Sequence, residues 1–254
     1  MTVRSLFDLP VAMGWRHVLF ANWPVEPALV EAHLPNALSV DTYDGQAWLS
    51  VVPFTNVAVR PKGLPDWTGF RLPELNLRTY VTHEGEAAEA GGDAGGTDDA
   101  PAADRGVYFF SLDADGILGV SGARIFHYLP YYFADVTLRT EGRSVTFSSD
   151  RWHPGARPCT FHARYEPDGN QYQFEPGSLT EFLTERYRYY TETPGGVLRY
   201  AQISHRPWPL YDASVELREN QVFETNGFAM PESDPVFRYS PGVDVTASGS
   251  RTVA

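Results

Sequence analysis

The sequence has one cysteine and one lysine in 254 residues. The single cysteine, Cys159, excludes an intramolecular disulfide and any zinc site built from several cysteines. No apolar run approaches the length of about 18 residues that a membrane-spanning helix needs. The first residues contain no uninterrupted apolar segment of the kind found in secretory signals. We therefore expect a cytoplasmic protein without a membrane segment.

Lysine is almost absent from a chain that is rich in acids. Lys62 is the only lysine among 20 basic residues, and 32 acidic residues give a formal net charge of −12. This balance is typical of a salt-adapted cytoplasm, in which surface carboxylates keep proteins soluble, although a GC-rich genome that favours arginine is an alternative explanation. The phosphate backbone of a nucleic acid would be repelled, and no basic stripe offsets the repulsion. We expect no nucleic-acid partner.

One segment differs in composition from the rest. Residues 84–104 contain seven acids, no base and no side chain larger than a carboxylate. Such a segment buries too little surface to offset its ordering entropy, so we expect a mobile loop. Strand-like patterns flank it directly in ELNLRTYV (74–81) and GVYFFSLD (106–113). The segment therefore predicts a long hairpin loop inside a single domain that spans residues 1–254.

Most of the remaining chain alternates in the manner of β-strands. Asp44-Gly45 predicts a hairpin turn, and hairpins with less specific signals are expected at Glu141-Gly142 and at 167–170. Helices are expected over 27–34 and over 178–192. Many antiparallel hairpins with few helices predict an α+β fold whose sheet is large enough to curl or close.

Several common sites are missing from the sequence. It has no phosphate-binding loop, Rossmann fingerprint or nucleophile elbow. His153, Cys159 and His162 lie close together in sequence, but their spacing fits no known metal-site geometry. Nothing beside Cys159 marks it as a nucleophile. We expect neither a metal nor a cofactor.

The run ELNLRTYV carries an unusual set of polar side chains. In a strand, Glu74, Asn76, Arg78 and Tyr80 share one face, while the leucines, the threonine and the valine share the other. The apolar face is ordinary core. The polar face is either the wet outside of a sheet or the wall of a pocket.

A second polar cluster occupies residues 122–136. Arg124, His127, Tyr131 and Tyr132 lie around a proline in an otherwise apolar stretch. Tyrosines in such places often serve packing rather than ligand binding. Arg124 is different, because a buried arginine needs an anionic partner from the protein or from a ligand.

Four segments of the chain resemble a known family. In order, they are LPNALSVDTYDGQAWLSVVPF, PELNLRTYV, GVYFFSLDADGILGVSGARIFHYLPYYFADV and PWPLYDASVEL. Together they resemble the DUF2071 family, also called YqjF-like, over roughly residues 11–245. This family is related to the acetoacetate-decarboxylase-like superfamily. The resemblance implies a strongly curved, mostly antiparallel β-barrel or cone with a few outer helices and a ligand-sized cavity.

In a closed curved sheet, one face of each strand looks into the lumen. We expect the polar face of 74–81 to be that face, with its exposure to solvent as the alternative. An arginine and an amide in one cavity suit a carboxylate or an enolate. The expected ligand-binding residues are Glu74, Asn76, Arg78, Tyr80, Arg124, His127, Tyr131 and Tyr132.

The resemblance does not carry the superfamily's chemistry with it. Acetoacetate decarboxylase forms a Schiff base on a lysine whose pKa is lowered by its surroundings. Lys62 instead lies in VRPKGLP, where exposure to solvent is expected, so we expect no Schiff-base decarboxylation. The favoured function is binding of a small anionic or oxygenated organic ligand. One alternative is a lysine-independent enzyme acting on a keto acid, enol or lactone, with Glu74 as general base and Arg78 as oxyanion stabiliser. Another is a scaffold that binds a partner, and a homo-oligomer is possible.

Overall fold

The computed structural model describes residues 10–83, 105–116 and 128–253. The predicted loop at 84–104 therefore lies outside the described residues, but its flanking strands pair antiparallel, as predicted, from Thr82 opposite Arg105 onward. The described residues form one sheet of thirteen strands with a few short helices. No helix in these ranges is long and apolar enough to span a bilayer.

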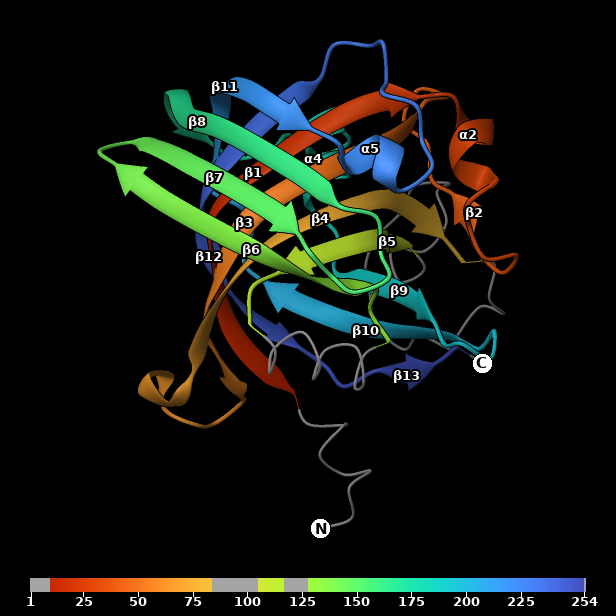
Figure 1. Ribbon diagram of the computed structural model, residues 1–254, viewed down its shortest axis with the longest axis horizontal. Coiled ribbons are helices and arrows are strands. Elements are labelled where there is room, and N and C mark those ends of the chain that lie inside the picture. Colours follow the sequence, from red (N-terminus) through yellow and green to blue (C-terminus); the bar gives the residue numbers. More distant parts are fainter. Residues whose placement is uncertain (1–9, 84–104, 117–127, 254) are drawn as a thin grey trace.

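The strands are, in chain order, β1 (Val11–Val25), β2 (Ser39–Val40), β3 (Ala47–Pro61), β4 (Phe70–Thr82), β5 (Arg105–Ala114), β6 (Tyr131–Glu141), β7 (Ser144–Arg151), β8 (Cys159–Tyr172), β9 (Arg188–Glu192), β10 (Leu198–His205), β11 (Leu210–Asn220), β12 (Val236–Ala247) and β13 (Arg251–Thr252). The helices are α2 (Pro27–Glu31), α4 (Leu179–Thr184), α5 (Val222–Thr225) and the 3₁₀ turn η1 (Asp66–Thr68). Strands β3 and β4 extend past the sheet as an arm that carries η1 (Figure 1).

The sheet forks at two strands and closes on itself twice. One edge of β5 pairs with β4, while its other edge pairs with β9 near Val107 and with β6 near Leu112. In the same way, β12 pairs with β1 on one edge and with both β11 and β10 on the other. The wall β5-β4-β3-β1-β12 is therefore shared by two rings. The larger ring is completed by β6, β7, β8 and β11, and the smaller ring by β9 and β10 (Figure 1).

Pairing is antiparallel throughout these rings except where β5 meets β6 and β9. The predicted fold class is confirmed: a strongly curved, mostly antiparallel sheet with a few short helices. The helical share is small, so the chain is mostly β.

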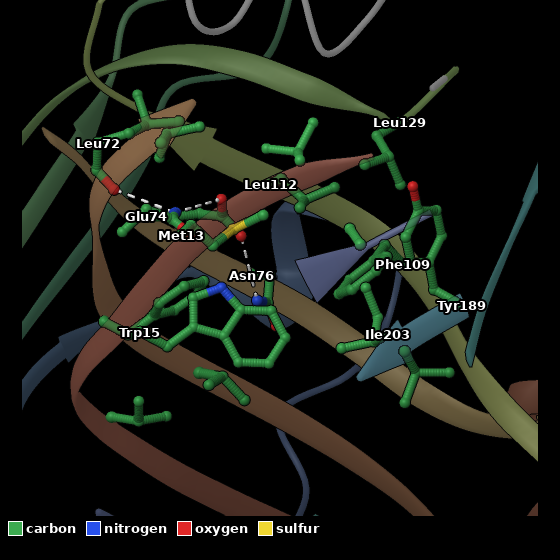
Figure 2. A pocket seen from close by; sticks show the side chains of 18 of the residues that line it. Met13, Trp15, Leu72, Glu74, Asn76, Phe109, Leu112, Leu129, Tyr189 and Ile203 are labelled. Carbon is green, nitrogen blue, oxygen red and sulfur yellow. Dashed lines mark hydrogen bonds between the residues drawn. The ribbon is translucent and has the colours of Figure 1, made fainter. Parts of the chain in front are cut away.

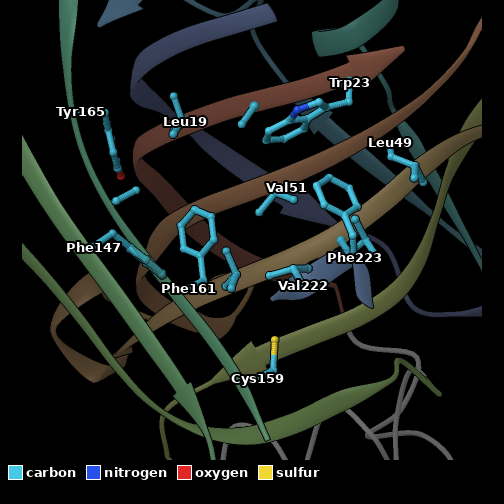
Figure 3. Close-up of a cluster of buried hydrophobic side chains, with 14 of the residues drawn as sticks. Leu19, Trp23, Leu49, Val51, Phe147, Cys159, Phe161, Tyr165, Val222 and Phe223 are labelled. Carbon is cyan, nitrogen blue, oxygen red and sulfur yellow. The ribbon is translucent and has the colours of Figure 1, made fainter. Parts of the chain in front are cut away.

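The larger ring is filled by apolar side chains. Leu19, Val51 and Leu77 from the shared wall meet Phe147 and Phe161 from the opposite side (Figure 3). Burying one such phenylalanine contributes about 1.5–3 kcal/mol. Because this ring is packed, the cavity of the fold lies elsewhere.

Gly242 allows strands β12 and β1 to approach each other closely. Gly242 of β12 has φ of 125°, and a Cβ there would lie 1.9 Å from the carbonyl oxygen of Trp15. Glycine alone permits both the backbone conformation and the contact. This contact fixes the part of β1 that presents Trp15 to the smaller ring.

The structure confirms two predicted turns. Asp44 and Gly45 have φ of 50° and 76°, but they close only the bridge between Tyr43 and Gln46, because β2 pairs with β4. The turn at Gly142 joins β6 to β7 as expected.

Two other predictions of local structure are wrong. No hairpin turns at 167–170, since β8 continues to Tyr172 along β11. The predicted helix over 178–192 ends at Thr184, and Arg188–Glu192 is strand β9. Its start is as expected, with Ser178 Oγ accepting from the N–H of Glu181. Beyond Thr184 the aromatic run pairs between β5 and β10, and this tertiary pairing outweighs helix propensity.

Candidate functional site

The smaller ring encloses a cavity of about 450 Å³. Ligand pockets in proteins are typically roughly 300–1,000 Å³. Its lining is mainly apolar and aromatic (Figure 2). The lining residues are Val11, Met13, Trp15, Val18, Phe20, Val52, Phe54, Asn56, Val59, Arg60, Pro61, Phe70, Leu72, Glu74, Asn76, Arg78, Val107, Phe109, Leu112, Leu129, Tyr131, Thr184, Arg186, Arg188, Tyr189, Ile203, His205, Trp208 and Ala247.

Alternation along β4 explains how polar side chains reach this cavity. Glu74, Asn76 and Arg78 line it, whereas Leu75 and Leu77 belong to the core of the larger ring. Since β4 lies in the wall shared by the two rings, each of its faces looks into a different ring. At Glu74, Asn76 and Arg78 the polar face is therefore a cavity wall and not a solvent face, whereas Tyr80 lies outside the lining.

Glu74 is held by three donors inside the cavity. Its Oε2 accepts hydrogen bonds from the hydroxyl of Tyr131 at 2.6 Å and from Nδ2 of Asn56 at 3.2 Å. Its Oε1 accepts a longer bond of 3.5 Å from Nδ2 of Asn76. A dashed line in Figure 2 joins Glu74 to Asn76. The carboxyl group is thus fixed in place by neighbours from three strands.

Burial controls the ionisation of this carboxyl group. Glu74 is only 4% exposed, and desolvation raises its pKa to about 6, against the opposing effect of its hydrogen bonds and of the Arg78 charge. Burial and the adjacent Glu74 raise the pKa of Tyr131 well above its usual value, so Tyr131 remains a donor. Glu74 is therefore able to exchange a proton near neutral pH.

Arg78 brings a positive charge without an ion-pair partner to the cavity. Its Nη2 donates to the backbone oxygen of Leu183 at 3.5 Å, and its buried Nε has no hydrogen-bond partner. The guanidinium carbon lies 5.5 Å from the ring centroid of Phe20 and 5.9 Å from that of Tyr80. No carboxylate in the described ranges forms an ion pair with it.

The other arginines of the lining are occupied. Arg186 donates to Asp41 at 2.7 Å, and both side chains are buried. Arg60 is paired with Asp66. Nη1 of Arg188 donates to the hydroxyl of Tyr190 at 3.1 Å. Arg78, by contrast, has no carboxylate partner in the described lining and one buried nitrogen without a hydrogen bond, so it is able to take an anionic ligand.

Two further polar atoms of the lining make no hydrogen bond. They are Oδ1 of Asn76 and Nε2 of His205, and both are buried. Nδ1 of His205 lies 2.8 Å from the carbonyl oxygen of Arg206, and burial lowers the pKa of its imidazole. His205 is therefore neutral near pH 7, with Nδ1 as donor and Nε2 free to accept.

The remaining predicted site residues have different positions. Tyr131 also lines the cavity. Tyr80 is fully buried outside the lining, with its hydroxyl 2.8 Å from both Ser50 Oγ and the Leu183 carbonyl oxygen. Tyr132 faces another depression, where the guanidinium carbon of Arg151 lies 4.1 Å from its ring centroid. Arg124 and His127 lie outside the described residues.

Sequence reasoning missed Asn56, Trp15 and His205. Trp15 and His205 lie on strands distant in sequence from ELNLRTYV, and they face the cavity only because the forked sheet closes the smaller ring. The signal that could have found Asn56 is its place two residues after Phe54 on an alternating strand.

The described cavity lining contains no lysine and no group of three side chains arranged to hold a metal ion. Lys62 is exposed after the end of β3, with its backbone N–H bonded to the oxygen of Pro10 at 2.8 Å. It does not line the cavity, which supports the sequence-based expectation of an exposed lysine. Cys159 is buried in the core of the larger ring (Figure 3). Across the described ranges, no three His, Cys, Asp or Glu side chains are arranged to hold a metal ion.

Solved structures share this fold. The enduracididine biosynthesis enzyme MppR complexed with pyruvate aligns with a TM-score of 0.63 at 13% identity, over 96% of this chain and 90% of that one. An acetoacetate decarboxylase-like enzyme from Sphingomonas wittichii RW1 aligns at 0.62 and 16% identity, over 97% and 93%. Acetoacetate decarboxylase from Legionella pneumophila aligns at 0.57 and 15% identity, over 96% and 87%. At these identities the likeness shows the fold alone.

Sequence relatives are closer. The chain is 42% identical over 232 residues to the uncharacterized protein YqjF of Bacillus subtilis strain 168, covering 91% of this chain and 87% of that protein. The model of the DUF2071 family, described as an uncharacterized conserved protein, matches residues 12–244. The chain therefore belongs to the DUF2071 family, on the acetoacetate-decarboxylase-like fold.

Proposed function

We propose that the cavity binds a small organic ligand with a carboxylate or another anionic oxygen group, and that it does so without Schiff-base chemistry. The observation that carries this proposal is the charge of Arg78. This guanidinium has a buried nitrogen without a hydrogen bond and no carboxylate partner, which destabilises the folded protein. A bound anion would supply the missing hydrogen bond and the opposite charge.

Other features of the cavity support the same ligand class. Asn76 adds a buried carbonyl oxygen and a donor next to Arg78 along β4. The described lining contains no lysine, so binding through an imine has no amine to use. MppR, which shares the fold, is described in complex with pyruvate, a small keto acid.

A thermal-shift screen of carboxylic and keto acids tests the proposal. We expect some acids to raise the melting temperature of the wild type, because a ligand that binds only the folded state stabilises it. Arg78→Met should abolish these shifts, while Arg139→Met on the exposed edge of β6 should retain them. Hits that persist unchanged in Arg78→Met would reject this site.

A second candidate function is general-base catalysis on a keto acid, enol or lactone. One observation favours it: the pKa of Glu74 is about 6 in a cavity, close to the pH at which a base is most effective. Glu74 would take a proton from a carbon next to the ligand carbonyl, and Arg78 would stabilise the resulting oxyanion. Tyr131 would position the carboxylate.

Proton exchange separates this candidate from binding alone. With a bound keto acid in D₂O, we expect the wild type to exchange the α-protons and Glu74→Gln to lose that exchange. Glu166→Gln, on the exposed side of β8, is the matched control. Binding without any exchange above the uncatalysed rate would leave the chain a binding protein.

A further inference from the structure

Glu74 and Arg78 stand at separate places along one strand. They are four residues apart on β4, so their Cα atoms are about 13 Å apart at the usual strand rise. Arg78 has no ion-pair partner in the described lining, and Glu74, on whose carboxyl group the Arg78 charge acts, becomes an anion as the pH rises through about 6. An anionic group of a ligand is therefore attracted to one place in the cavity and repelled from the other.

A continuous row of aromatic rings connects the two places. The guanidinium of Arg78 lies over Phe20, whose ring centroid is 5.2 Å from that of Trp208. Trp208 stacks on Trp15 with 5.8 Å between centroids, and Trp15 lies 5.9 Å from Phe54 in an edge arrangement. All four aromatic residues line the cavity.

The row ends next to Glu74. Phe54 of β3 is the direct cross-strand partner of Glu74. On the facing side, Phe109 and Ile203 close the cavity with further apolar surface (Figure 2). Between Arg78 and Glu74, the cavity thus offers mainly apolar contacts. This apolar stretch is longer than a short keto acid.

We propose that the ligand of this cavity is a monocarboxylate with an apolar body the size of an aromatic ring. Its carboxylate lies at Arg78, and its body lies along Phe20, Trp208, Trp15 and Phe54. This inference rests on the function proposed above and narrows its ligand class. Small keto acids such as pyruvate and dicarboxylates are poor ligands.

Cavity volume and charge lead to the same class. Water occupies about 30 Å³ per molecule in the liquid, so a cavity of about 450 Å³ holds far more than a three-carbon acid displaces. Pyruvate would leave the aromatic row in contact with water. A second carboxylate would lie near Glu74, in apolar surroundings, or beside an arginine that already has a partner, and each place is less favourable than the one at Arg78.

Calorimetric titration with a matched ligand series tests the inference. The probes are pyruvate, phenylpyruvate and phenylsuccinate at pH 7.5. Burying a ring-sized body should make phenylpyruvate bind at least about tenfold more tightly than pyruvate. Phenylsuccinate, which carries a second carboxylate, should bind more weakly than phenylpyruvate.

Variants of Trp15 and Arg78 test which part of the ligand each side chain contacts. Trp15 is only half-buried, so Trp15→Leu should fold, and a matching melting temperature checks this. Trp15→Leu should weaken phenylpyruvate binding at least about threefold and leave pyruvate nearly unchanged, whereas Trp15→Phe should retain most of the affinity. Arg78→Met should weaken both acids together.

Each result has a distinct meaning. If pyruvate or phenylsuccinate binds as tightly as phenylpyruvate and Arg78→Met abolishes binding, the ring-sized class is wrong while the anion-binding function stands. If no acid binds the wild type, or if Arg78→Met binds as the wild type does, the anion-binding function itself is wrong. Preference for phenylpyruvate that depends on both Trp15 and Arg78 supports the inference.

Discussion

The hydroxyl of Tyr131 donates a 2.6 Å hydrogen bond to Oε2 of Glu74, although the two residues are 57 positions apart in sequence. Tyr131 begins β6 at the place where β5 forks, and Glu74 lies on β4 in the shared wall. This bond therefore exists only when the forked sheet has formed. It ties the ionisation of the cavity carboxyl group to the overall fold.

Glu74 should make stability depend on pH. The pKa of this buried carboxyl group is raised from 4.5 to about 6, so the folded state binds a proton that the unfolded state releases between those values. Its contribution to stability is greatest below pH 4.5 and falls by about 2 kcal/mol as the pH rises past 6. The free energy of unfolding of Glu74→Gln, relative to wild type, should therefore rise by about 2 kcal/mol from pH 4 to pH 7 in urea titrations. A relative stability that is constant or falls with pH would contradict this account.

Removing the Tyr131 hydroxyl should raise the pKa of Glu74 further. In Tyr131→Phe the ionised carboxylate loses its shortest hydrogen bond, and a bond to a charged group contributes about 1.5–3 kcal/mol. We expect a loss of that size in the free energy of unfolding at pH 8, with an upward shift of the Glu74 carboxyl titration followed by NMR. Tyr211→Phe, whose hydroxyl bonds to the exposed Gln171, is the control and should lose little. An unchanged Glu74 titration would show that this bond does not set the pKa.

The buried pair of Asp113 and Arg151 should respond strongly to loss of one member. Arg151 Nε donates to Asp113 Oδ1 at 2.7 Å, and both side chains are almost fully buried. Asp113→Asn leaves a buried, uncompensated guanidinium, so we expect a loss of about 3–5 kcal/mol in chemical denaturation. The double variant Asp113→Leu with Arg151→Met should be less destabilised than either single variant. A double variant whose loss equals the sum of the single losses would mean that the two charges do not interact.

Lys62 should take no part in covalent chemistry. Its exposed position past the end of β3 keeps its amine outside the cavity lining, away from any carbonyl compound bound there. We expect borohydride treatment with acetoacetate or pyruvate to leave no adduct at Lys62 in peptide mass mapping. Lys62→Ala should retain ligand binding and change stability by less than about 0.5 kcal/mol. A reduced adduct on Lys62 would restore Schiff-base chemistry as a hypothesis.

Period-two alternation allowed part of the site to be predicted from the sequence. Glu74, Asn76 and Arg78 share a face because successive side chains of a strand point to opposite sides. In a closed sheet, such a face points either into the ring or away from it, and here it points into the cavity. Tyr80 has the same parity but leaves the cavity, because its ring packs on Phe182 of α4 and its hydroxyl bonds to Ser50. Alternation gives the face of a strand but not the point where the cavity ends.

The fork of the sheet could not be predicted. Pairing of β5 with both β6 and β9 depends on contacts between segments that are far apart in sequence, and no local pattern encodes them. The same pairing turned Arg188–Glu192 into a strand where a helical apolar period was expected. Trp15 and His205 line the cavity because the fork closes the smaller ring. The pattern of a single strand could therefore not predict them.

A crystal structure grown with saturating phenylpyruvate would show whether Arg78 and Trp15 hold the ligand. We expect electron density inside the smaller ring, with the carboxylate within hydrogen-bond distance of Arg78 and the phenyl ring against Trp15. The matched crystal of Arg78→Met should show no ordered ligand there. An empty cavity at saturation, or a ligand whose carboxylate lies away from Arg78, would contradict the account.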